Sequence, residues 1–321
     1  MKPSAVLSLV ARVAVTAFAF WWVLRSVDLA ALGGVLRNAD PLWLLAAIGL
    51  FLTSQAACVA RWWFLAPAHP SVKLPFLADS FLVAQFFNVF LPSTIGGDVI
   101  RGYDLIKATG EWKGSLASIL MDRLVGFVGS AGFAAAAWAL FPPARQDPVI
   151  RSAFAGICIL LVVTFTVLGS RRVLRTMLKP FSKIGLGTLE AHAKQFQEAL
   201  RGYLGKPRKM LGALGMTVVI QFAWILMFAA VTRALHIRVP VIFLVLVIPI
   251  IMLVSQMPVS LNGWGVREGA TVLLLGRIQV PAAEALSLSL IGAAMPFIGA
   301  SVGAILFLAR RRKKPRRDGS A

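Results

Sequence analysis

Two segments with the same pattern, PSTIGGDVIRGY at residues 92–103 and PVSLNGWGVREG at residues 258–269, decide the expected fold. Each follows an apolar stretch, residues 74–91 in the first case and residues 240–257 in the second. When the two segments are aligned without gaps, the same residue types recur at matching positions: Pro92 with Pro258, Gly97 with Gly263, and Arg101 with Arg267. This recurrence predicts an internal repeat.

The composition of the chain indicates an integral membrane protein. Of its 321 residues, 58% are hydrophobic and 14% are charged, and the mean hydropathy is +0.80. These values exclude an ordinary soluble domain, which needs more polar surface to stay in solution. The formal charge of +20 does not indicate nucleic acid as a partner, because the Lys and Arg residues gather in loops and at the C-terminal end.

Apolar runs long enough to cross about 30 Å of hydrocarbon predict membrane-spanning helices. Six runs meet this length: residues 5–24, 42–60, 114–140, 152–169, 210–234 and 282–308. Together with the stretches 74–91 and 240–257 they make eight hydrophobic segments, which predicts an all-α integral membrane protein. Tryptophans near the ends of these segments are typical of interfacial anchors: Trp43, Trp62, Trp63, Trp112 and Trp138.

The distribution of basic residues predicts the orientation. Residues 170–209 contain ten Lys and Arg residues, and the tail 310–321 begins with RRRKKPRR. By the positive-inside rule both are cytoplasmic, which also places the N- and C-termini on the cytoplasmic side of a bacterial inner membrane. Apolar residues from Leu189 to Tyr203 fall at helical spacing and predict a basic amphipathic helix on anionic lipids of the inner leaflet. A solvated helix without lipid contact is the alternative.

Counting spans from this orientation predicts an inverted-topology repeat. Residues 61–113 begin and end on the cytoplasmic side, whereas residues 235–281 begin and end outside, so each motif lies in a re-entrant hairpin. The expected fold is one polytopic domain, residues 1–309, with six full spans and two hairpins that enter from opposite faces. Its repeats are approximately residues 1–145 and 146–309, an architecture found in many transporters. In the alternative, each hairpin is a full span and each motif is a loop.

The motifs carry residue types that suit a bound phosphate. A second short helix is expected to begin at Asp98 in the first motif and after Asn262 in the second, because Asp and Asn are good N-caps. Helix N-termini offer free amide groups and a positive dipole end, and Arg101 and Arg267 lie close to them. The candidate substrate-binding residues are Arg101, Arg267, Asp98, Asn88, Asn262, Gly96, Gly97 and Gly263.

An arginine at membrane depth is unfavourable by about 3 kcal/mol, so its presence in each repeat needs a physical reason. A lipid phosphate bound by Arg101 and Arg267 would supply that reason. Alternatively, both arginines pair with nearby acids or extend to the interface, and only stabilise the fold. Asp122 is expected as a proton acceptor or as the partner of one of these arginines. The candidate proton-transfer or ion-pair residues are Asp122, Arg123, Glu268 and Asp79.

The cysteines and histidines do not predict a metal site or a nucleophilic catalytic site. Cys58 and Cys158 lie in separate apolar stretches, and the three histidines lie in different loops. We therefore expect no cofactor.

Three segments resemble the signature segments of a known family: FFNVFLPSTIGGDVIRGYDL (86–105), MDRLVG (121–126) and PVSLNGWGVREGA (258–270). This is the flippase-like YbhN-type family, which is named for the lysylphosphatidylglycerol synthase transmembrane region. The resemblance spans nearly the whole chain and implies movement of a phospholipid or polyprenyl-linked lipid between leaflets. Two-part members also carry a soluble synthase domain, whereas a short basic tail follows Phe307 here. The resemblance therefore does not imply lysyltransferase activity.

The leading functional hypothesis is a flippase-like protein that translocates an anionic phospholipid or a lipid-linked intermediate. The sequence contains no Walker motif, so a gradient or mass action is expected to drive the movement. The alternative is an accessory subunit or lipid-modifying enzyme component that binds a lipid-linked substrate for a partner transferase. A third hypothesis is a purely structural subunit, because architecture alone does not fix function.

Overall fold

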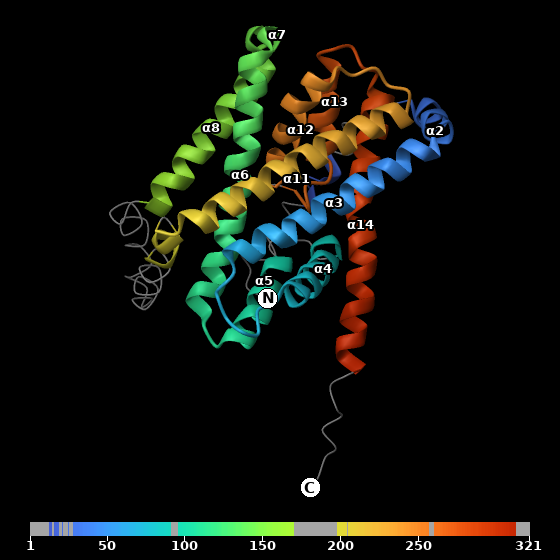
Figure 1. Cartoon of the computed structure of the whole chain (residues 1–321). Helices are drawn as coiled ribbons and strands as arrows, with labels where there is room; N and C mark the ends of the chain where they lie inside the picture. Colours follow the sequence, from blue (N-terminus) through green and yellow to red (C-terminus); the bar gives the residue numbers. More distant parts are fainter. Residues whose placement is uncertain are drawn as a thin grey trace.

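The computed structural model describes residues 13–14, 16–18, 21, 25, 28–90, 96–169, 198–203, 205–256 and 260–312, and these form helices joined by turns and loops. Figure 1 shows the arrangement of the helices. Their bounds are α2 (Leu29–Arg37), α3 (Pro41–Leu65), α4 (Leu74–Phe90), α5 (Gly96–Thr109), α6 (Trp112–Leu140), α7 (Pro142–Gln146), α8 (Pro148–Gly169), α11 (Pro207–Ala234), α12 (Val241–Ser255), α13 (Val266–Gly276) and α14 (Ala282–Arg312).

Four described helices are long and apolar enough to cross a membrane: Pro41–Leu65, Trp112–Leu140, Pro207–Ala234 and Ala282–Arg310. They correspond to four of the six expected spans. The expected span 152–169 lies within α8, which is not one of these four. Most of the expected span 5–24 lies outside the described residues. The same holds for the expected amphipathic helix, apart from residues 198–203, which are helical.

The long helices expose apolar side chains on their outer surfaces, as expected for contact with lipid. The clearest examples are Leu42 and Leu45 on α3, Leu211 and Phe222 on α11, and Ile305 and Leu308 on α14. A soluble protein rarely exposes large apolar side chains along several of its long helices. The exposure therefore agrees with a multi-pass membrane protein.

The two motif-bearing segments form pairs of short helices. Helix α4 has 17 residues and α12 has 15, so at about 1.5 Å per residue each is shorter than the roughly 30 Å hydrocarbon core. Each is followed by a second short helix, α5 and α13 respectively. In Figure 1 the pair α4/α5 lies toward the end of the molecule where α14 finishes, and α12/α13 lies toward the other end.

Helix α12 is buried around most of its circumference. Phe243, Leu244, Leu246 and Ile248 are each at most 1% exposed, although they point in different directions from the helix axis. A helix that is apolar on all sides belongs in a core rather than at a surface. It packs on α6, α11 and α13, and the corresponding short helix α4 packs on α3, α5 and α14.

Small residues allow α4 and α14 to approach closely. Gly303 on α14 faces the Leu82 carbonyl of α4, and a Cβ built at Gly303 would overlap that oxygen. Gly299, one turn earlier, faces the side chain of Gln85 in the same way. Glycines four residues apart commonly mediate such close packing of membrane helices. This contact positions α4, which carries part of the site described next.

Candidate functional site

A cavity of about 430 Å³ lies between the two short-helix pairs and the long helices. Its lining residues come from α3, α4, α5, α6, α11, α12, α13 and α14, and from the connection between α12 and α13. Arg101 of the first motif and Arg267 of the second both line it. The two motifs, which are distant in sequence, therefore contribute to one space of a size typical for small ligands.

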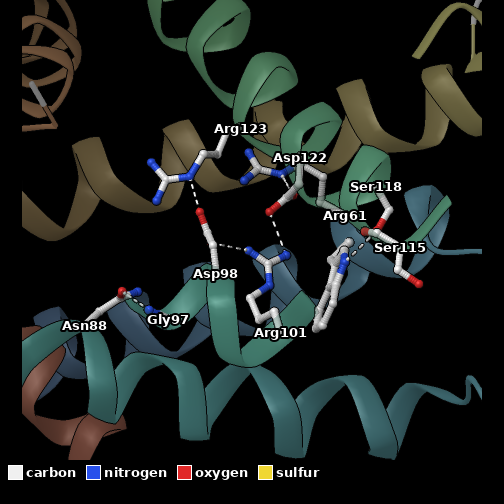
Figure 2. Close-up of polar contacts among 10 residues, drawn as sticks. Arg61, Asn88, Gly97, Asp98, Arg101, Ser115, Ser118, Asp122 and Arg123 are labelled. Atoms are coloured by element: carbon white, nitrogen blue, oxygen red, sulfur yellow. Dashed lines mark hydrogen bonds and ion pairs between the residues drawn. The ribbon is translucent and has the colours of Figure 1, made fainter. Parts of the chain in front are cut away.

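Arg101 is fixed by contacts on both sides of its guanidinium group. Its Nη2 donates to Oδ2 of Asp122 at 2.9 Å, and its Nη1 donates to Oδ1 of Asp98 at 3.4 Å. Its guanidinium carbon lies 4.0 Å from the ring centroid of Trp62. Trp62 is fully buried, which corrects its interpretation as an interfacial anchor. Figure 2 shows Arg101 pointing from α5 toward α6.

Asp122 joins two arginines. Besides accepting from Arg101, it accepts at Oδ1 from Nε of Arg61, a residue of α3, at 2.7 Å. Arg61 also approaches Oγ1 of Thr217 on α11 at 3.5 Å. Asp122 is thus the partner of Arg101, one of the two arginines considered for it, and it ties α3, α5 and α6 together (Figure 2).

Asp98 and Arg123 form a second ion pair beside the first. Nε of Arg123 donates to Oδ2 of Asp98, which also receives Arg101 at its other oxygen (Figure 2). The Arg123 side chain is 25% exposed, compared with 7% for Arg101 and 5% for Asp122. The cluster therefore extends from a buried end at Asp122 to a more accessible end at Arg123.

The first motif is pinned to α4 by Asn88. Its Oδ1 accepts a hydrogen bond of 2.7 Å from the backbone N–H of Gly97 in the first turn of α5. A Cβ at Gly97 would lie 2.5 Å from both the Ala84 carbonyl oxygen and Nδ2 of Asn88, so only glycine fits there. Helix α5 begins at Gly96, so Asp98 lies inside the first turn rather than capping it. Residues 91–95 lie outside the described residues.

The second motif has a different local geometry. Glu268, which is fully buried, accepts from the backbone N–H of Gly265 at 2.6 Å and thereby caps α13. Its other oxygen accepts from Nε and Nη2 of Arg267 at 2.9 and 2.8 Å. Gly263 and Gly265 have φ values of 75° and 79°, which glycine adopts without strain. The N-cap of α13 is Gly265, not Asn262.

Asn262 connects the two motifs directly. Its Nδ2 donates to the backbone carbonyl of Asn88 at 2.6 Å, joining the turn before α13 to the end of α4. Asn262 has a φ of 50°, a left-handed conformation that favours Asn over most other residues. The two motifs therefore meet at the cavity wall.

The charges that line the cavity favour an anion. Arg61, Arg101, Arg123 and Arg267 line it, and Asp98 and Asp122 are the acids among the lining residues. Both carboxylates are paired with arginine. Arginine presents a planar fork of donors that matches phosphate and carboxylate groups.

Comparison with known proteins now identifies the chain. The family described as "Lysylphosphatidylglycerol synthase TM region" matches residues 9–314. The chain belongs to this family. Membership makes it a membrane protein tied to lipid biosynthesis or transport, and it confirms the resemblance seen in the three signature segments. No curated protein and no solved structure matches the chain significantly.

Two further charged residues lie on opposite sides of the cavity boundary. Asp79, a candidate ion-pair residue, is outside the lining, and its carboxylate pairs with Arg310 near the end of α14, which also binds Asp104. Arg61 lines the cavity although the sequence interpretation omitted it. The sequence does contain a signal for this position. The apolar residues WWFL follow Arg61, so α3 continues through Leu65 and Arg61 lies in the interior.

Proposed function

We propose that this chain translocates an anionic phospholipid, or a lipid-linked phosphate intermediate, between the leaflets of the inner membrane. The observation that carries the proposal is the shared cavity, in which the motif arginines Arg101 and Arg267 line one space with an excess of arginine over acid. An anionic headgroup is the ligand that this charge balance favours. Family membership supports a ligand from lipid metabolism.

An inverted-topology repeat would allow the cavity to face each side of the membrane in turn. The alignment of the two motifs supports such a repeat, because it also places Pro41 on Pro207, the first residues of α3 and α11. It equates α4 with α12 and α6 with α14. The contacts are consistent with this equivalence, since α4 packs on α14 and α12 packs on α6. The short lengths of α4 and α12 support re-entrant hairpins that enter from opposite faces.

We propose that the headgroup phosphate binds by exchange with the carboxylates that now hold the arginines. Arg101 pairs with Asp122 and Asp98, and Arg267 pairs with Glu268. An unpaired buried arginine would be strongly unfavourable, so these pairs satisfy the guanidinium groups while the cavity is empty. The buried Nε of Arg101 has no hydrogen-bond partner among the described residues and could donate to the phosphate. A proton-coupled cycle would use Asp98, Asp122 or Glu268.

Transfer of a fluorescent lipid in vesicles tests the proposal. The purified protein is reconstituted with fluorescently labelled phosphatidylglycerol, and an impermeant reductant then reveals how fast label reaches the outer leaflet. Wild type is compared with Arg101→Gln, Arg267→Gln and the matched control Arg151→Gln, an exposed residue of α8. Removal of a charge-assisted hydrogen bond to phosphate should slow transfer at least about tenfold in the two cavity variants. The control should transfer like wild type.

Two results would contradict translocation. The first is wild-type protein that transfers label no faster than protein-free vesicles. The second is transfer in Arg101→Gln and Arg267→Gln at the wild-type rate while both variants remain folded. If phosphatidylglycerol copurifies with wild type in an arginine-dependent way but does not cross, the chain is an accessory subunit or enzyme component that binds a lipid-linked substrate.

A further inference from the structure

A second cavity, of about 480 Å³, lies where α3 ends and α11 begins, and it shares no lining residue with the central cavity. Trp63, Phe64, His69, Arg208 and Lys209 are among its lining residues. We infer that this cavity binds the headgroup of an anionic phospholipid. The lipid belongs to the leaflet that lies nearest the basic N-terminus of α11. This lipid would be a resident ligand rather than the transported one.

The wall of the cavity is firmly built. The last carbonyls of α3 are both satisfied by side chains from other segments: Leu65 accepts from the Tyr203 hydroxyl at 2.7 Å, and Ala66 accepts from Nζ of Lys209 at 3.2 Å. Free carbonyls at a helix end otherwise require water. Phe64 packs against Gly212 of α11, where a Cβ would lie 2.6 Å from the phenyl ring. These contacts hold the cavity open between two packed helices.

The charge around the cavity is positive without compensation in its lining. Arg208 and Lys209 line it, and no Asp or Glu residue does. Both lie in the first turn of α11, a helix of 28 residues that begins at Pro207. Cations at a helix N-terminus are unfavourable because the positive dipole end lies there, and a bound anion reverses that effect. The positive-inside rule accounts for the number of basic residues in the segment before α11. It does not account for the position of Arg208 and Lys209 around a cavity that no Asp or Glu lines.

His69 adds an N–H donor to the same cavity. Its Nδ1 accepts a hydrogen bond of 3.2 Å from the backbone N–H of Ser71. Because Nδ1 accepts, Nε2 carries a proton and is left as a donor. A phosphate group has several acceptor oxygens and can take bonds from Arg208, Lys209 and a histidine N–H together.

The apolar lining indicates a lipid rather than a soluble anion. Trp63 is 49% exposed and Phe64 is partly buried, and both line the cavity beside the basic residues. A tryptophan with one apolar and one polar side is typical of the membrane interface, where headgroups lie. The cavity thus combines phosphate donors with surface that can contact the glycerol backbone and upper acyl chain.

Native mass spectrometry of lipids retained by the detergent-solubilised protein tests this inference. Wild type, Arg208→Gln and Arg208→Gln/Lys209→Gln are incubated with phosphatidylglycerol or phosphatidylcholine. The control is Lys107→Gln/Lys113→Gln, which removes the same charge at the α5–α6 connection, outside the cavity lining. Loss of charge-assisted hydrogen bonds should weaken phosphatidylglycerol retention roughly tenfold in the double variant. The control should retain lipid like wild type, and Arg208→Gln, which keeps the Lys209 contact with Ala66, should be intermediate.

The inference would be overturned if the double variant retained as much phosphatidylglycerol as wild type. It would also be overturned if wild type retained phosphatidylcholine as well as phosphatidylglycerol. Displacement of the lipid by millimolar glycerol phosphate would show a site for soluble phosphate instead of a lipid. The result is separable from the central cavity, because Arg101→Gln/Arg267→Gln should keep this lipid. Failure at Arg208 and Lys209 therefore leaves the translocation proposal intact, and failure of translocation leaves this site intact.

Discussion

Arg101 and Asp122 form a buried ion pair at 2.9 Å, with side-chain exposures of 7% and 5%. Asp122 is shared with Arg61 at 2.7 Å, so one carboxylate neutralises part of the charge of two arginines on different helices. Removing one member of such a pair leaves charge buried without a partner, which is far less favourable than removing the whole pair. The stability of the helix arrangement around the cavity therefore depends strongly on Asp122.

We expect Asp122→Asn to lower the free energy of unfolding by about 3–5 kcal/mol, because Arg61 and Arg101 lose their shared counter-charge. The thermal midpoint in detergent measures the effect. Asp28→Asn is the matched control, since Asp28 caps α2 at an exposed position where Asn caps equally well. The double variant Arg61→Gln/Asp122→Asn should lose less than the sum of the single losses. A midpoint for Asp122→Asn equal to that of the control would show that Asp122 does not hold the cluster.

The electrostatic potential of the central cavity can be measured through the reactivity of Cys58, a partly buried residue of its lining. In a Cys158→Ser background, Cys58 is the remaining thiol of the chain. We expect a negatively charged thiosulfonate reagent to modify it about tenfold faster than a positively charged one of similar size, because the surrounding arginines concentrate anions. Mass spectrometry of the modified protein measures both rates.

The ratio of the rate with the negatively charged reagent to the rate with the positively charged one should fall when Arg101 or Arg267 is replaced by Gln. It should remain unchanged in Arg151→Gln, a substitution on α8 outside the cavity lining. It should also fall at high salt, where screening weakens the field in a partly exposed cavity. Faster modification by the positively charged reagent would mean that the carboxylates, rather than the arginines, set the potential around Cys58.

Several parts of the fold and site follow from sequence because they depend on local patterns. The apolar runs 42–60 and 210–234 predict α3 and α11 to within a few residues, since their lengths match the hydrocarbon thickness. The recurrence of Arg101 and Arg267 predicts a shared site, and both arginines do line one cavity. The recurrence of the residue types is visible in the sequence itself, so the pattern is enough to suggest that the two arginines act together.

The remaining parts of the site depend on contacts between distant residues. Arg61 looks like the flank of an apolar run, and only the packing of α3 against α6 brings it to Asp122. The binding of Asp79 by Arg310 likewise joins residues from opposite ends of the chain. In the second motif, the capping of Gly265 by Glu268 requires a glycine at positive φ, a geometry that composition does not specify. Sequence gives the residue types in these cases but not their partners.

The close approach of α4 and α14 predicts that a glycine substitution at their contact is more destabilising than one at an open helix surface. Gly303→Ala should lower the thermal midpoint, because the added methyl overlaps the Leu82 carbonyl and the two helices must separate. Gly215→Ala on α11 is the matched control, since no atom lies within 4 Å of its added Cβ. Alanine is favoured over glycine in a helix interior by roughly 0.5–1 kcal/mol, so the control should be neutral or slightly stabilising. Equal midpoints for the two variants would mean that α4 and α14 do not touch at Gly303.

An ion pair between Asp147 and Arg277 predicts a dependence of stability on pH. Asp147 lies between α7 and α8 and accepts from Nε of Arg277 at 2.6 Å and from the N–H groups of Val149 and Ile150. Partial desolvation raises the pKa of Asp147, but the hydrogen bonds from Arg277 and the backbone outweigh it and hold that pKa below its usual value. A lowered pKa in the folded state means that the contact stabilises fully above the unfolded pKa of about 4.

As the pH falls from 5 through the folded pKa, protonation of Asp147 should remove that stabilisation, and the thermal midpoint of wild type should drop more than that of Asp147→Asn. The Arg277 side chain is 41% exposed, so the difference should stay below about 1 kcal/mol. Asn can still accept the backbone hydrogen bonds that begin α8, so the variant isolates the ion pair from the cap. Parallel pH profiles for the two proteins would mean that the pair contributes nothing.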